Sequence, residues 1–260
     1  MSASLPNYAL SAPSGVEGAS LQQLRICAES GLRLALRAFI ATASASLPPV
    51  DIVFGSAGRL AQLLASGACC DLLLTTDEHL ALESAPQGRV PAPFATDMLV
   101  IAGRSELSLS SAGLLERLAN PRLRIGVALP ASDSGHSPVE RFFARAEALQ
   151  PGSAAALRAR ARPILSNGEL PAPRRVMEML GSGEVDVVLG AASALRTLSS
   201  VAEIVVPPPA LSVTITSYMV LLASDAERVL AARFYASVLC GRPGQALLAR
   251  HGFSPLPSPL

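Results

Sequence analysis

Tryptophan is absent from the sequence, tyrosine occurs three times, and the 260 residues carry a formal net charge of only +1. A protein that binds nucleic acid usually presents a basic face, because lysine and arginine neutralise the phosphates that it contacts. Platforms for unpaired bases also need aromatic side chains, which make up 4% of this chain. The composition therefore predicts no nucleic-acid partner.

Metal-binding patterns are missing as well. No C-x-x-C pair occurs among the four cysteines, which are Cys27, Cys69, Cys70 and Cys240. The three histidines, His79, His136 and His251, are scattered, and no zinc-ligand spacing joins them to the cysteines. We therefore predict neither a metal site nor a cofactor.

Long apolar runs are also lacking, since no uninterrupted segment approaches the roughly 18 residues that a membrane-spanning helix needs. Residues 1–19 have neither the basic start nor the apolar core of a signal peptide, and we expect a flexible lead. Two locations stay open: the cytoplasm, or the periplasm with an export signal that this sequence does not include. Hydrophobic residues make up 50% of the chain, which is ample for a buried core.

The most informative stretch is residues 50–78. An apolar strand at 52–54 leads through a small-residue turn at 55–58 into a helix, and a second strand is expected at 71–75. Free N–H groups and the Ser56 hydroxyl at such a helix start can bind an anion. The alternative is an ordinary strand-to-helix turn without a ligand.

The same arrangement comes first in the chain. A strand at 24–28 is followed by a turn at Ser30 and Gly31 and then by a helix. Two consecutive strand–turn–helix units predict a parallel sheet, with both turns at the carboxyl ends of their strands. Ligands of open α/β sheets bind at that edge, so Ser30 and Ser56 are candidate ligand-binding residues.

A third polar loop, at residues 130–137, precedes a helix for which Ser137 is the expected N-cap and Pro138 the first residue. The loop contains Ser134 within Asp-Ser-Gly, a tripeptide that often holds the nucleophile of a serine protease. A catalytic triad also needs a base and an orienting acid, and the surrounding pattern is parallel α/β. We therefore predict a protein that is not an enzyme.

Further strands are expected at 97–102, 122–128, 186–189, 204–206 and 212–222, and helices at 226–239 and 243–250. Residues 154–162 show a less regular pattern.

Arg174 and Arg175 begin a helix that continues through Met177 and Leu180. A helix start disfavours cations, so these arginines either lie in solvent or turn into an anion pocket.

A series of motifs runs from about residue 24 to residue 255. They are residues 54–58 with Leu60, Gly67 with Asp71, residues 124–126, residues 133–135 leading to Phe142 and Phe143, residues 183–187, and residues 244–253. In order and spacing they resemble the molybdate-type solute-binding proteins of ABC importers. Those proteins have the type II periplasmic-binding-protein fold.

The resemblance implies an α/β protein with two Rossmann-like lobes, a hinge and a cleft between them. We place lobe 1 at residues 20–98 and 219–260, lobe 2 at residues 99–218, and the crossings near 98–102 and 218–222. In this family serine hydroxyls and backbone N–H groups at helix starts hold an oxyanion. The corresponding positions here are Ser30 or Gly31, Ser56, Ala57, Ser134, Gly135 and Ala191. Arg174, at a helix start, is a further candidate ligand-binding residue.

Three positions depart from the family pattern. Ala57 replaces a second serine, Ala191 lies where a tyrosine is often found, and Pro173 lacks the N–H expected at that helix start. Each lost hydrogen bond to a charged ligand costs about 1.5–3 kcal/mol.

The resemblance implies a monomeric solute-binding protein that delivers molybdate or tungstate to the membrane subunits of an ABC importer. The altered positions leave a different anion or a small organic acid open as the ligand. The alternative function is a cytoplasmic sensor that uses the same cleft. An enzyme on this fold ranks last.

Overall fold

The computed structural model describes residues 23–43, 47–128, 137–164, 173–199, 202–254 and 256. The expected flexible lead at 1–19 and two of the candidate residues, Ser134 and Gly135, lie outside the described residues. No helix built from the described part of the chain is long and apolar enough to cross a membrane.

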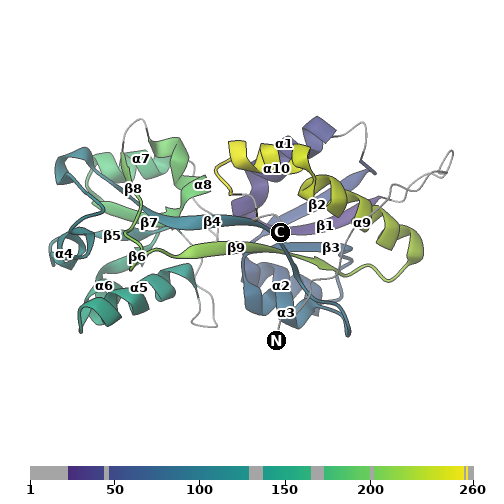
Figure 1. Ribbon diagram of the computed structural model, residues 1–260, viewed down its shortest axis with the longest axis horizontal. Coiled ribbons are helices and arrows are strands. Elements are labelled where there is room, and N and C mark those ends of the chain that lie inside the picture. The colour runs from purple at the N-terminus through teal and green to yellow at the C-terminus, as the bar shows by residue number, and fades with distance from the viewer. Residues whose placement is uncertain are drawn as a thin grey trace.

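The first group of strands is built mainly from the two ends of the chain (Figure 1). Its elements are β1 (Leu24–Glu29), α1 (Arg33–Ala43), β2 (Val50–Gly55), α2 (Ala57–Ala65), β3 (Leu72–Thr75), α3 (Glu78–Ser84), β9 (Thr214–Leu221), α9 (Ala226–Cys240) and α10 (Arg242–Arg250). Strand β1 pairs in parallel with both β2 and β3, which confirms the expected parallel sheet. Strand β9 lies antiparallel to β3.

The second group comes from the middle of the chain. Its elements are α4 (Leu114–Ala119), β5 (Ile125–Val127), α5 (Pro138–Leu149), α6 (Ser153–Arg160), β6 (Ala161–Pro163), α7 (Pro173–Gly181), β7 (Val187–Ala191), α8 (Ala192–Leu195) and β8 (Glu203–Val205). Strand β5 is parallel to β6 and β7. The expected mixed α/β fold is therefore confirmed in both groups.

Strand β4 (Ala92–Gly103) joins the two groups. Its residues up to Met98 pair with β9, and its residues from Leu99 onward pair with β7 and β8. Figure 1 shows β4 and β9 running side by side between the groups. The expected lobe boundary after residue 218 falls inside β9, because β9 pairs with the first-group part of β4 from Thr214 onward. We propose that the two groups are the two lobes.

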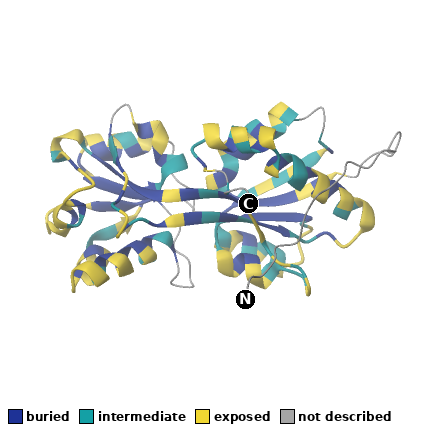
Figure 2. Cartoon of the chain, viewed as in Figure 1, coloured by how far each residue is buried: buried dark blue, intermediate teal, exposed yellow. Residues whose placement is uncertain are grey.

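Alternating side chains of the strands fill a core on each face of the sheet. In β1, Ile26 and Ala28 pack beneath α1, α9 and α10, whereas Cys27 packs toward α2 and α3. In β4, Leu99 packs toward α5 and Val100 toward α7. Figure 2 shows buried strands between helices whose outer faces are exposed. Both faces of each group are therefore covered by helices.

The α5 start agrees with the sequence. The Ser137 hydroxyl accepts a hydrogen bond of 3.2 Å from the Glu140 N–H, and Pro138 is the first helical residue. The expectation of a less regular segment at 154–162 was wrong, because α6 occupies Ser153–Arg160. The start of α6 is capped by a residue of the preceding helix, because the Glu147 carboxylate of α5 accepts hydrogen bonds from the N–H groups of Gly152 and Ala154.

Candidate functional site

The carboxyl ends of β1, β2 and β3 in the first group, and of β5 and β7 in the second, point toward the place where β4 changes partners. We call this place the junction and define it by Met98, Leu99 and Thr214. Strand β4 runs from the first group into the second, so β9, which is antiparallel to it, runs back into the first. Strand β3 is antiparallel to β9 and therefore runs toward the junction, as do β1 and β2.

The second group mirrors this direction. Strand β7 is antiparallel to β4, and its last residue, Ala191, pairs with Leu99 at the junction. Strand β5 is parallel to β7 and ends at the same edge. Two carboxyl edges therefore face the junction from opposite sides, which is the position where ligands bind in open α/β sheets.

The first edge brings two predicted residues together. Glu29 at the end of β1 is in register with Gly55 at the end of β2, so Ser30 and Ser56 follow neighbouring strands. Ser56 is half-buried and is the N-cap of α2, where its hydroxyl accepts a 3.3 Å hydrogen bond from the Arg59 N–H. Ala57 is the first residue of that helix, where backbone N–H groups have no partner within the helix.

Open space lies beside the turn that follows β1. Ser30 begins a single turn of 3₁₀ helix that includes Gly31 and ends at Leu32. Gly31 is exposed, and a Cβ atom added to it would meet nothing within 4 Å. This backbone is therefore accessible to a ligand.

Arg33, which was not among the residues predicted from the sequence, also lies at this edge. One guanidinium nitrogen of Arg33 lies 3.5 Å from the Ser30 hydroxyl, and the group stacks 4.9 Å from the centre of the Phe54 ring. Arg37, one turn later on α1, lies 5.8 Å from the same ring. The signal available in the sequence was the spacing of three residues between Ser30 and Arg33, which places both on one side of a helical turn.

A buried acid also lies at this edge. Glu29 accepts hydrogen bonds from the Thr75 hydroxyl and, at 2.5 Å, from the Thr76 hydroxyl, which tie the end of β1 to the end of β3. Burial raises the pKa of the Glu29 carboxyl above its ordinary value, although the hydrogen bonds from Thr75 and Thr76 oppose the shift. The edge thus combines an arginine with a buried acid whose pKa is raised above its ordinary value.

At the second edge the donors near Ala191 already have an acceptor. The buried Asp97 carboxylate accepts from the Ser193 N–H at 3.2 Å and from the Met98 N–H at 2.7 Å. Burial raises the pKa of the Asp97 carboxyl. Helix α8, which follows Ala191, is therefore capped by a side chain of the protein itself.

Arg174 lies in solvent and does not turn into an anion pocket in this structure. Its side chain is 85% exposed, and its Nε atom lies 3.1 Å from the Glu178 carboxylate on the same helix. Pro173 is the first residue of α7 and is also exposed.

No set of three acidic, cysteine or histidine side chains within the described ranges is arranged to hold a metal ion.

Several solved structures share this architecture. The periplasmic molybdate-binding protein of Azotobacter vinelandii is 17% identical with a TM-score of 0.67, and the match covers 90% of this chain and 100% of that one. The sulfate-binding protein SubI of Mycobacterium tuberculosis H37Rv is 15% identical with a TM-score of 0.66, covering 91% and 88%. Iron-bound HitA of Pseudomonas aeruginosa is 20% identical with a TM-score of 0.62, covering 92% and 87%.

At these identities the similarity shows a shared fold. No curated protein matches the sequence. Residues 24–254 match the family described as bacterial extracellular solute-binding protein, a span that contains every helix and strand of the structure. The chain therefore belongs to this family of bacterial extracellular solute-binding proteins and has the type II periplasmic-binding-protein fold.

Proposed function

We propose that this protein binds a small oxyanion at the junction and delivers it to the membrane subunits of an ABC importer. The observation that carries the proposal is the pairing of β1 with β2, which brings the Ser30 and Ser56 turns together at the edge facing the second group. Hydroxyl groups and N–H groups at helix starts stabilise anions. Closure of the two lobes would surround the ligand.

The chemistry of this edge favours an anion over a metal cation. Two hydroxyls, the accessible Gly31 backbone and the Arg33 guanidinium are donors or positive charges. The similar proteins are named for molybdate, sulfate and iron, and the donor set here agrees with the first two. We propose molybdate or tungstate as the first ligand to test, since the sequence motifs resemble the molybdate-type proteins.

A small organic acid is the second candidate ligand. Ala57 offers no hydroxyl where relatives of the molybdate type have one, whereas Arg33 adds a cation. A guanidinium group binds a carboxylate through two parallel hydrogen bonds, so an arginine at this edge suits a small organic acid.

Titration calorimetry over a panel of anions tests the proposal. Molybdate and tungstate should bind more tightly than sulfate, phosphate and small carboxylates. Tighter binding of a carboxylate would assign the protein to organic acids instead. The absence of binding by every anion in the panel would overturn the proposal.

The family description also supports a location outside the cytoplasmic membrane. We propose the periplasm as the place of action. Cell fractionation with an antibody against the native protein checks this, and recovery in the cytoplasmic fraction alone would favour the sensor alternative.

A further inference from the structure

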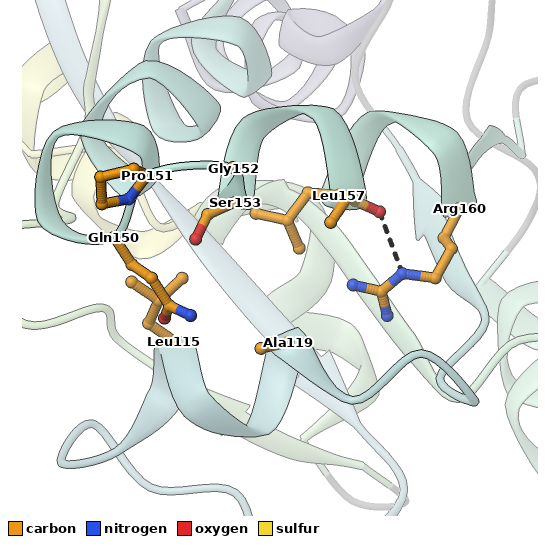
Figure 3. Close-up of a pocket in the computed structure, with 9 residues that line it drawn as sticks. Leu115, Ala119, Gln150, Pro151, Gly152, Ser153, Leu157 and Arg160 are labelled. Carbon is orange, nitrogen blue, oxygen red and sulfur yellow. Dashed lines mark hydrogen bonds between the residues drawn. The ribbon is translucent and has the colours of Figure 1, made fainter.

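A surface pocket of about 240 Å³ lies between α4 and α6 in the second group (Figure 3). It is lined by Leu115, Ala119, Gln150, Pro151, Gly152, Ser153, Ala156, Leu157 and Arg160. Helix α4 ends shortly before β5 begins, and Arg160 immediately precedes β6. The pocket is therefore at the amino edge of these strands, opposite the carboxyl edge that faces the junction.

One end of the pocket holds a buried hydroxyl. Ser153 is only 7% exposed, and its Oγ atom has no hydrogen-bond partner among the described residues. Figure 3 shows this hydroxyl directed into the space between α6 and α4, near Gln150 and Leu115. A buried polar group without a partner is destabilising, so a ligand that bonds to it gains affinity.

The hydroxyl is not needed as a cap for α6. The Glu147 carboxylate already accepts from the N–H groups of Gly152 and Ala154, at 2.8 and 2.9 Å. These N–H groups at the start of α6 therefore already have an acceptor, and the Ser153 hydroxyl remains available to another partner.

The other end of the pocket holds a fixed cation. The Arg160 guanidinium donates to the carbonyl groups of Ala156, Asn120, Leu118 and Leu123, at 3.0, 2.5, 2.7 and 3.4 Å. These acceptors are neutral, and no carboxylate pairs with Arg160 within the described parts of the chain. Burial lowers the pKa of Arg160, as expected for a cation that is not neutralised. One of its five N–H groups remains for a ligand.

Apolar side chains lie between these two polar ends. Leu157 is buried at the floor, and Leu115 and Ala119 of α4 face it across the pocket. Ser153 and Arg160 are seven residues apart on one helix, which is about 10 Å along its axis. A pocket of this size is smaller than those that hold drug-sized molecules.

We propose that this pocket is a second ligand site, which takes a short aliphatic carboxylic acid with a hydroxyl group at the far end. The carboxylate lies against Arg160, a chain of about four to six carbons lies on Leu115 and Leu157, and the terminal hydroxyl bonds to Ser153. This site is separate from the anion site at the junction, and the proposal does not depend on that site.

The test uses the full chain labelled with ¹⁵N and three probes: 6-hydroxyhexanoate, hexanoate and 1,6-hexanediol. We expect saturable amide shifts at residues 115–119 and 150–160 with the hydroxy acid. Hexanoate should bind about five- to tenfold more weakly, because it lacks one hydrogen bond. The diol lacks the charge and should give no saturable shifts.

Three variants test whether the probes bind in this pocket and not elsewhere on the protein. Ala156→Phe fills the pocket and should abolish binding, whereas Ala155→Phe, at an exposed neighbouring position outside the lining, should not. Ser153→Ala should weaken the hydroxy acid about five- to tenfold and leave hexanoate unchanged. Absence of saturable binding, or equal binding by the two Phe variants, would overturn the proposal. Displacement by molybdate would also overturn it, since the ligand would then occupy the junction.

Discussion

Arg33 stacks on Phe54, with its guanidinium carbon 4.9 Å from the ring centre. The contact joins the helix that follows β1 to the last part of β2, and it holds a positive charge beside the Ser30 hydroxyl. An arginine that stacks on a ring loses less conformational freedom when it binds an anion, because its orientation is already restricted.

Replacement of Arg33 by alanine should weaken binding of the junction anion about tenfold or more, because a charge-assisted hydrogen bond is lost. Arg37→Ala is the matched control, since Arg37 lies over the same ring but one turn farther along α1. Titration calorimetry measures both. Equal losses for the two variants would show that the effect is a general change in surface charge.

Ser56 is the N-cap of α2 and also a proposed ligand-binding residue, and replacement by alanine would remove both functions. Ser56→Ala should weaken anion binding at least tenfold, and it should also destabilise the unliganded protein by about 1 kcal/mol because the N-cap of α2 is lost. Ser56→Asp keeps a good cap but places a negative charge at the anion site. This variant should keep the stability and lose the binding, as measured by urea unfolding and calorimetry. Retained affinity in Ser56→Asp would remove Ser56 from the site.

Ligand binding should raise the melting temperature by mass action. At a concentration 100 times the dissociation constant, the gain in unfolding free energy is about 2.7 kcal/mol. Molybdate and tungstate should therefore shift the melting curve more than sulfate or phosphate at equal concentration. A panel of thermal melts checks this, and the same order in the Ser56→Asp variant would contradict binding at the junction.

Glu29 should make stability depend on pH in a defined direction. Because burial raises its pKa in the folded state, the folded protein holds this proton more tightly than the unfolded chain does. The resulting stabilisation is complete below the unfolded pKa, near 4.5, and is lost as the pH rises through the folded pKa. Glu29→Gln should therefore gain stability relative to the wild type as the pH increases. Urea unfolding of both proteins from acidic to neutral pH measures the difference, and a constant difference would contradict the shift.

Asp186 should act in the opposite direction. Hydrogen bonds from the Arg124 side chain, at 2.8 and 2.9 Å, lower the pKa of the Asp186 carboxyl. Its stabilisation is present above the unfolded pKa, near 3.8, and is lost as the pH falls through the folded pKa. Asp186→Asn should lower the melting temperature at neutral pH, and the gap to the wild type should close in acid.

Glu178→Gln provides the control for Asp186→Asn. It breaks the surface pair with Arg174, whose side chain is 85% exposed, and should leave the melting temperature almost unchanged. A comparable loss in this variant would show that surface charge, and not the contact between Arg124 and the Asp186 carboxylate, sets the effect.

The sequence by itself determined the fold class and the first edge of the candidate site. Apolar runs followed by Ser/Gly turns predicted β1, β2 and their helices, because local hydrophobic periodicity and capping depend on neighbouring residues alone. The parallel pairing of β1 with β2 followed from the same pattern and brought Ser30 and Ser56 together.

Only the tertiary structure decided which distant groups meet. The stacking of Arg33 on Phe54, and the hydrogen bond between Asp97 and the Ser193 N–H, join residues that no local pattern connects. The same is true of the pairing of Thr214 with Met98, which depends on the register between β9 and β4. Periodicity specifies which side of a strand is buried, but the partner of a buried polar group is set by packing between segments that are far apart in the sequence.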